Sequence, residues 1–277
     1  FGSVISESGQ AYTWGENAHE FRLTPWHNDP VSDASGEAFY LRDEESGQFW
    51  SPTPLPRRGA APYVSRHGFG YSVFEHADGG IQSELWVYVA QDAAVKFSVL
   101  KVRNSSGRPR RLSATGYVEW VLGDLRPKSA MHVASEVDPY SVAIFTRNRY
   151  NTEFPDRVAF FDVDDTSRTF TCDRAEFIGR NGSLEHPAAM MRTHLSGRVG
   201  SGLDPCAAIQ WVLIWRTGSN ARSPSGSALA ECRAAMMPIS WCIDCVAPML
   251  RGGPWRRSGI TGTTPSAQCR SRRPTSR

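Results

Sequence analysis

The feature that most constrains the fold is a succession of short apolar segments, each bounded by a turn signal. The segments are rich in Val, Phe, Tyr and Trp, and several alternate apolar with polar residues, which is the period of half-buried β-strands. They span residues 83–90, 94–103, 111–122, 141–146 and 157–163. Clusters of Gly, Asn, Ser and Asp separate them at 78–80, 104–107, 164–165 and 181–182. With no sustained stripe at the helical period, this pattern predicts an all-β fold, a large antiparallel β-sandwich.

The clearest single unit is a hairpin over residues 69–90. Its turn at Asp78-Gly79-Gly80 supplies glycines for the positive-φ positions that a tight reversal needs. Aromatic residues fall on both faces of its strands, as Trp86 and Tyr88 alternate with Leu85 and Val87. This distribution predicts a hairpin that is covered on both sides.

The composition excludes several classes of protein. The chain has 277 residues, 40% of them hydrophobic and 21% charged, which rules out collagen, coiled coil and general disorder. No stretch approaches the roughly 18 apolar residues that a transmembrane helix needs. The chain begins with Phe1 and no signal peptide is recognisable, so we expect a piece of a longer polypeptide.

The character of the sequence changes near residue 210. Residues 1–210 carry 26 acidic and 21 basic side chains, a net charge of −5, whereas residues 211–277 carry 2 acidic and 10 basic ones, a net charge of +8. All ten of these basic residues are Arg, in text rich in Ser, Pro, Gly and Cys. We therefore predict a sandwich domain over 1–210 and an irregular, low-order tail over 211–277. A shifted reading frame in a GC-rich gene would produce such a tail, and a disordered basic tail is the alternative.

The motifs with obvious chemistry are weak here. Cys242 and Cys245 form a C-x-x-C pair, but Pro and Gly interrupt the helix that a redox site needs, and no second pair completes a zinc site. The seven histidines include no zinc-protease pattern, and no phosphate loop or nucleophile elbow is present. We predict no metal and no cofactor. Nucleic-acid binding by the Arg-rich tail is a minor alternative, and no nucleic-acid partner is expected.

One segment, residues 6–50, combines aromatic rings with polar side chains in loops. Trp, Tyr and Phe are interleaved with Glu, Asn, Asp and Arg, and prolines and glycines interrupt any regular element. Aromatic rings stack on the apolar faces of sugars, while planar polar groups bridge their hydroxyls. The composition therefore suits a saccharide site, although a core of aromatic residues with internal ion pairs explains it as well.

The same segment carries a resemblance. Residues 6–56 resemble the start of the β-sandwich domain of glycoside hydrolase family 94, formerly glycosyltransferase family 36. Further matching motifs are RHGFGYS at 66–72, GYVEWVLG at 116–123, and Arg147-Asn148 with Tyr150-Asn151. Within the family the chain is most similar to the phosphorylase-like C-terminal region of cyclic β-1,2-glucan synthases. The resemblance covers about 1–210 and then stops, which favours a sandwich truncated at its last strands.

The resemblance implies an architecture and a role. The sandwich would be of the supersandwich, galactose-mutarotase-like type, followed in the family by a helical linker and an (α/α)6 barrel that carries the catalytic acid and the phosphate site. This chain would then be a carbohydrate-binding fragment of a glycosyltransferase or inverting glycoside phosphorylase, inactive alone. Implied partners are a β-glucan oligosaccharide, the missing barrel and a second copy in a homodimer. The parent synthases are bacterial inner-membrane proteins, which implies the cytoplasmic side.

Sandwich loops in the family reach the barrel mouth and help to form the acceptor side of the sugar site. On the matching segment, our candidates for carbohydrate contacts are Trp14, Glu16, Arg22, Trp26, Asn28 and Asp29. The tryptophans would stack on sugar rings, Arg22 would hold carboxylates or donate to hydroxyls, and Asp29 would accept from hydroxyls. Two alternatives remain: residues 22–29 are a purely structural clamp, or the chain is a self-sufficient hydrolase or transferase that uses Glu7, Glu16 or Asp29.

Overall fold

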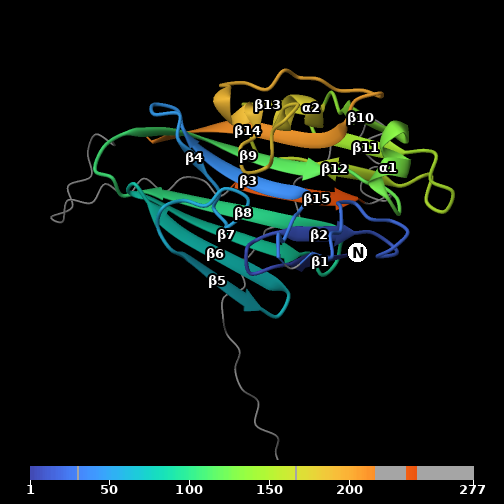
Figure 1. Cartoon of the computed structure of the whole chain (residues 1–277), viewed down its shortest axis with the longest axis horizontal. Helices are drawn as coiled ribbons and strands as arrows, with labels where there is room; N and C mark the ends of the chain where they lie inside the picture. The colour runs from blue at the N-terminus through green and yellow to red at the C-terminus, as the bar shows by residue number, and fades with distance from the viewer. Residues whose placement is uncertain (30, 166, 216–234, 242–277) are drawn as a thin grey trace, which may run out of the picture. The chain divides into compact units, whose positions relative to one another are not determined.

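The computed structural model describes residues 1–215 and 235–241, apart from 30 and 166. Within this part, two larger antiparallel sheets and a separate two-stranded hairpin make up the fold (Figure 1). The larger sheet has the strand order β10-β11-β12-β15-β8-β7-β6-β5. Its strands are β5 Tyr63–Gly68, β6 Tyr71–Asp78, β7 Ile81–Val89, β8 Val95–Asn104, β10 Val133–Val137, β11 Ile144–Asn148, β12 Val158–Phe161 and β15 Ala235–Trp241.

The smaller sheet has five strands in the order β13-β14-β9-β3-β4. Its strands are β3 Glu37–Asp43, β4 Phe49–Trp50, β9 Arg110–Glu119, β13 Arg168–Asp173 and β14 Pro205–Trp215. The hairpin pairs β1 Gly2–Ile5 with β2 Ala11–Trp14. The helical pieces are α1 Arg126–Ser129, η1 Ala130–His132, α2 Arg174–Ile178 and η2 Ala188–Met191. None of these described helices is long enough to cross a membrane.

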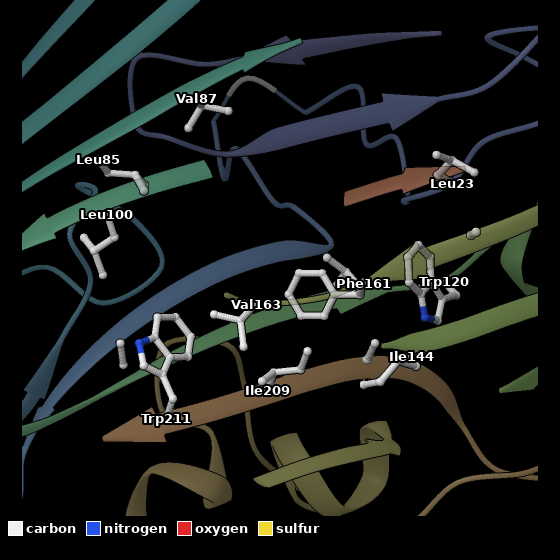
Figure 2. Packing of buried hydrophobic residues seen from close by; sticks show 14 of the residues in the cluster. Leu23, Leu85, Val87, Leu100, Trp120, Ile144, Phe161, Val163, Ile209 and Trp211 are labelled. Atoms are coloured by element: carbon white, nitrogen blue, oxygen red, sulfur yellow. The ribbon is translucent and has the colours of Figure 1, made fainter. Parts of the chain in front are cut away.

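The main hydrophobic core lies between the two sheets. Figure 2 shows Ile209 and Trp211 of β14 in the same interior as Leu85 of β7 and Leu100 of β8. Burial of side chains of this size stabilises the fold by roughly 1.5–3 kcal/mol each relative to exposure. Trp120, which follows β9, is fully buried at the other end of this layer.

A second core covers the opposite face of the five-stranded sheet. Successive residues of a strand point to opposite faces, so Tyr117 of β9 belongs to the second core while Val118 belongs to the first. Phe177 of α2 stacks on Tyr117 with ring centroids 4.6 Å apart, and Tyr40 of β3 lies in the same cluster. Because both of its faces are packed, this sheet carries aromatic residues on both faces.

The predicted antiparallel β-sandwich is confirmed, and the predicted 69–90 hairpin is present as β6 and β7. Gly79 and Gly80 have φ angles of +55° and +77°, as the turn requires. Phe69, which the pattern assigned to the first strand, instead lies fully exposed at the preceding turn.

The predicted boundary at 210 falls inside β14, and β15 lies within the segment predicted to be an irregular tail. β15 pairs with β12 on one side and with β8 on the other, so it is an interior strand of the eight-stranded sheet. The division into 1–210 and 211–277 otherwise stays a prediction. Cys242 and Cys245 lie outside the described residues.

Candidate functional site

The predicted tryptophans lie on either side of a tyrosine. Tyr12 of β2 stacks on Trp14, with ring centroids 5.2 Å apart. The centroids of the Tyr12 and Trp26 rings are 5.1 Å apart. The other side of the Trp14 ring lies directly against Gly2 of β1, where a Cβ atom would collide with it. Trp14 is therefore held in the packing of the hairpin. Trp26 keeps 44% of its surface exposed and is the tryptophan of this pair that can meet a ligand.

Arg22 and Glu16 are held by neighbours within the protein. The backbone of Arg22 exchanges hydrogen bonds with Gly123, with N···O distances of 3.0 and 3.3 Å. Burial raises the pKa of the Tyr12 hydroxyl, and the Arg22 guanidinium beside it opposes that rise. Glu16 lies at a turn with a φ of +34° and forms an ion pair with Arg157. The backbone of Arg22 and the side chain of Glu16 thus tie the segment after β2 to neighbouring loops.

Asn28 and Asp29 lie exposed in the loop that follows Trp26. The Asp29 carboxylate accepts hydrogen bonds from the Ser32 hydroxyl at 2.6 Å and from the backbone N–H groups of Val31 and Ser32 at 3.0 and 3.3 Å. The Ser32 hydroxyl is the main cause that holds the pKa of Asp29 below its ordinary value. Asp29 therefore stabilises its own turn, as Asp residues in Asx-turns do.

A cavity of about 310 Å³ opens beside the Arg22–Gly123 bridge. Three segments line it. Glu20 comes from the loop after β2, and the stretch between β9 and β10 contributes Gly123, Asp124, Lys128, Ser129 and His132. The end of β11 and the loop after it contribute Asn148, Tyr150, Asn151, Thr152 and Glu153. We call it the Tyr150 pocket. Its side chains are mainly polar, and its volume lies at the lower end of the range for ligand sites.

A strained backbone turn next to the Tyr150 pocket is held by two amides that line the pocket. Leu122 is fully buried with a φ of +48°, a conformation that a residue with a side chain rarely adopts. Its carbonyl accepts from Asn148 Nδ2 at 2.9 Å and from Asn151 Nδ2 at 3.3 Å. The same two asparagines accept from the backbone N–H groups of Tyr150 and Glu153 at 3.1 and 3.0 Å. These bonds fix the loop that carries Tyr150, and strain of this kind is often found at functional sites.

The rim of the pocket carries an aromatic pair. His132 of η1 stacks on Tyr150 with ring centroids 4.3 Å apart and an angle of 9° between the planes. Tyr150 remains 74% exposed, and Glu20 and Glu153 lie around it. An exposed ring supported from behind, with carboxylates and amides beside it, can stack on one sugar face and hydrogen-bond to hydroxyls.

A second cavity, of about 410 Å³, lies in the loop before β5. Its lining is Pro, Ala and Gly with Arg58, and its Tyr63 ring is already stacked on His76 at 3.8 Å. Neither cavity is lined by Glu7, Glu16 or Asp29, the carboxylates of the self-sufficient enzyme alternative. Among the described residues, no three His, Cys, Asp or Glu side chains gather closely enough to hold a metal ion.

Sequence reasoning placed the site on residues 14–29 and missed the Tyr150 pocket. Its parts come from three loops far apart in the chain, so no local pattern unites them. The motif of Arg147-Asn148 with Tyr150-Asn151 was the available signal, because it combines an aromatic ring with amides after a strand. Of the six predicted residues, the structure brings Trp14 and Trp26 together through Tyr12, and it brings Arg22 next to the pocket through Gly123.

Two antiparallel sheets packed face to face, with helical pieces over the outer face of the smaller one, define a β-supersandwich domain of the kind found in carbohydrate-active enzymes. The chain belongs to glycosyl hydrolase family 94, and residues 1–222 match the supersandwich domain of that family. This match extends 12 residues past the predicted boundary at 210. Its relatives act in carbohydrate metabolism.

A cyclic β-(1,2)-glucan synthase of Rhizobium meliloti is 37% identical over 76% of this chain and 8% of that protein. An N,N'-diacetylchitobiose phosphorylase of Vibrio furnissii is 26% identical over 80% of this chain and 29% of that protein. A cellobionic acid phosphorylase of Neurospora crassa is 28% identical over 66% of this chain and 24% of that protein. The chain thus spans less than a third of the length of each of these relatives.

Proposed function

We propose that this chain is the saccharide-binding supersandwich part of a β-glucan synthase or phosphorylase-like glycosyltransferase, similar to the cyclic β-1,2-glucan synthases. It holds a β-glucan oligosaccharide at the Tyr150 pocket, with Trp26 as a further stacking surface. In this proposal, an (α/α)6 barrel is the partner of this chain and carries out the bond-breaking chemistry. Alone, the chain binds saccharide and turns none over.

One observation carries this proposal: Tyr150 presents a 74% exposed ring, supported by His132, above a polar cavity on loops. The His132 ring and the Asn148 hydrogen bond hold Tyr150 in place, so its free face offers a flat apolar surface on which a sugar ring can stack. The family supports the ligand class, because the members named above include a cyclic β-(1,2)-glucan synthase and an N,N'-diacetylchitobiose phosphorylase.

We also propose a cytoplasmic location for the parent protein and a homodimer contact through this domain. Cys172 and Cys206 are buried free thiols, and burial raises the pKa of the Cys172 thiol to about 12, so neither is activated. Free thiols suit a reducing compartment, which supports the cytoplasmic side of a bacterial inner membrane as the site of the parent protein. In the assembled protein, this domain contributes to the contact between the two copies of a homodimer.

The test is a titration of the purified chain with β-1,2-linked glucose oligosaccharides, followed by calorimetry or NMR. We expect Tyr150→Ala to weaken binding at least tenfold, because removal of a stacked ring costs on the order of 1.5 kcal/mol. Tyr140→Ala is the matched control, since Tyr140 is 84% exposed and does not line the pocket. Equal affinities for the Tyr150 and Tyr140 variants would refute the site.

The same preparation tests the claim of inactivity. Incubation with β-1,2-glucan and inorganic phosphate should release no glucose 1-phosphate. Robust release would show that the chain carries its own catalytic centre, in favour of the self-sufficient enzyme.

A further inference from the structure

The Tyr150 pocket has an uneven distribution of charge. Its lining includes the carboxylates of Glu20, Asp124 and Glu153 and the single ammonium group of Lys128. Lys128 is committed to Asp124, with Nζ 2.6 Å from Oδ2, one helical turn away. These two charges cancel, so the charge that remains at the pocket comes from Glu20 and Glu153.

The lining of the Tyr150 pocket holds more carboxylates than cations. Among the described residues that line it, Lys128 is the one Lys or Arg side chain. His19 lies outside the lining and contacts Glu20 through Nδ1 at 2.7 Å. Arg157 is paired with Glu16. The exposed tyrosine therefore has an excess of carboxylates over Lys and Arg side chains in the pocket around it.

We propose that Glu20 and Glu153 are specificity-determining residues that admit uncharged sugars to the Tyr150 pocket and exclude anionic ones such as uronates. This inference rests on the proposed saccharide-binding function and adds a selection rule to it. Discrimination arises by repulsion: a sugar carboxylate stacked on Tyr150 would lie near two like charges, and the lysine of the pocket lining is already paired with Asp124.

The size of the effect follows from the setting. The pocket is open to water, where the interaction between two charges is much weaker than in a protein interior. We expect the anionic sugar to bind roughly 3- to 10-fold more weakly than its neutral counterpart at low ionic strength. Salt should reduce the difference, because the screening length falls to about 8 Å at physiological ionic strength.

The experiment compares methyl β-D-glucoside with methyl β-D-glucuronide, which share a ring and differ by one carboxylate. Chemical-shift changes of the full chain give both dissociation constants at neutral pH, at low and at high NaCl. The double variant Glu20→Gln/Glu153→Gln should bring the two constants together, because it removes the two charges that repel the glucuronide carboxylate. Glu45→Gln is the control, because Glu45 is an exposed acid that does not line the pocket.

The outcomes separate the two proposals. If neither methyl glycoside shifts the resonances of the pocket, and β-1,2-linked oligosaccharides also fail, the saccharide function and this inference fall together. If the glucoside binds but the glucuronide binds equally well, or if the double variant leaves their ratio unchanged, only the selection rule is wrong. A ratio that collapses in the double variant and persists in Glu45→Gln supports it.

Discussion

At the scale of single residues, the least expected feature is a fully buried ion pair. Lys96 of β8 and Glu37 of β3 are 1% and 3% exposed, and the ammonium group contacts the carboxylate directly. The Thr13 hydroxyl accepts from Lys96 Nζ at 2.6 Å and donates to Glu37 Oε1 at 2.6 Å. Thr24 donates to the same oxygen at 3.0 Å. The pair thus joins one strand from each sheet to the hairpin strand that carries Trp14.

We predict that Lys96→Met destabilises the fold by about 3–5 kcal/mol, because it leaves the Glu37 charge buried without a partner. The double variant Lys96→Met/Glu37→Gln removes both charges, keeps an acceptor for Thr13 and Thr24, and should recover at least half of that loss. Urea unfolding measures the free energy of unfolding of the single and of the double variant. If the double variant is as unstable as the single one, the cost does not come from an unpaired charge.

Asp29 offers a pH-dependent prediction. Its pKa is lowered in the folded state, so its contribution to stability is present above its ordinary value of 3.8 and is lost as the pH falls through the lowered pKa. Ser32→Ala removes the largest cause, and we expect the Asp29 pKa to rise partway to normal, as followed by NMR of the carboxyl carbon. The titration of Asp124, which Lys128 controls, should stay unchanged; an unmoved Asp29 would contradict the assignment.

At the scale of elements, the short helix α2 shows how a cap positions a core residue. The Asp173 side chain accepts from Ala175 N at 3.0 Å, and Gly179 ends the helix with a φ of +89°. Arg198 forms an ion pair with the same aspartate, with Nη1 2.6 Å from Asp173 Oδ2. This single turn of helix brings Phe177 onto Tyr117 and closes the second core.

We therefore predict that Asp173→Ala lowers the free energy of unfolding by about 1 kcal/mol, the usual cost of a lost N-cap. Asp173→Asn retains the capping oxygen and should lose much less. Thermal unfolding of the two variants makes the comparison, and an equal loss in both would assign the effect to the Arg198 ion pair instead.

The elements also show what the sequence could and could not predict. The β6–β7 hairpin was predictable, because two glycines fix its turn and alternation fixes its faces. β15 was not, since Pro238 lies in its middle and lacks the N–H that an interior strand normally donates. The Lys96–Glu37 pair and the Tyr150 pocket depend on contacts between distant segments, and a polar residue in a strand does not reveal its partner.

At the scale of the whole molecule, the sandwich depends on residues beyond the predicted boundary. Residues 211–215 of β14 pair with 110–114 of β9. Trp211 and Leu213 are 2% and 7% exposed in the core between the sheets. The boundary that composition suggested therefore divides β14, an interior strand of the five-stranded sheet.

We predict that a chain of residues 1–210 loses cooperative unfolding and binds hydrophobic dyes, because it exposes the main core together with edges of β8, β9 and β12. Trp211→Ala in the full chain should cost about 3–5 kcal/mol yet leave one cooperative transition. Differential scanning calorimetry of the 1–210 chain and of the Trp211→Ala variant shows whether each unfolds in one cooperative transition. A 1–210 chain that melts within a few degrees of the full chain would show that the strand end is dispensable.

The placement of β15 has a consequence for synthesis on the ribosome. β8 ends at Asn104, and the strand that fills the gap beside it starts only at Ala235. At ordinary elongation rates these intervening residues take on the order of ten seconds to emerge. β12, which borders the same gap, is complete at Phe161. Until β15 is made, the edges of β8 and β12 lack their partner, so a chaperone that shields β-edges would protect the nascent chain most between the synthesis of β12 and that of β15.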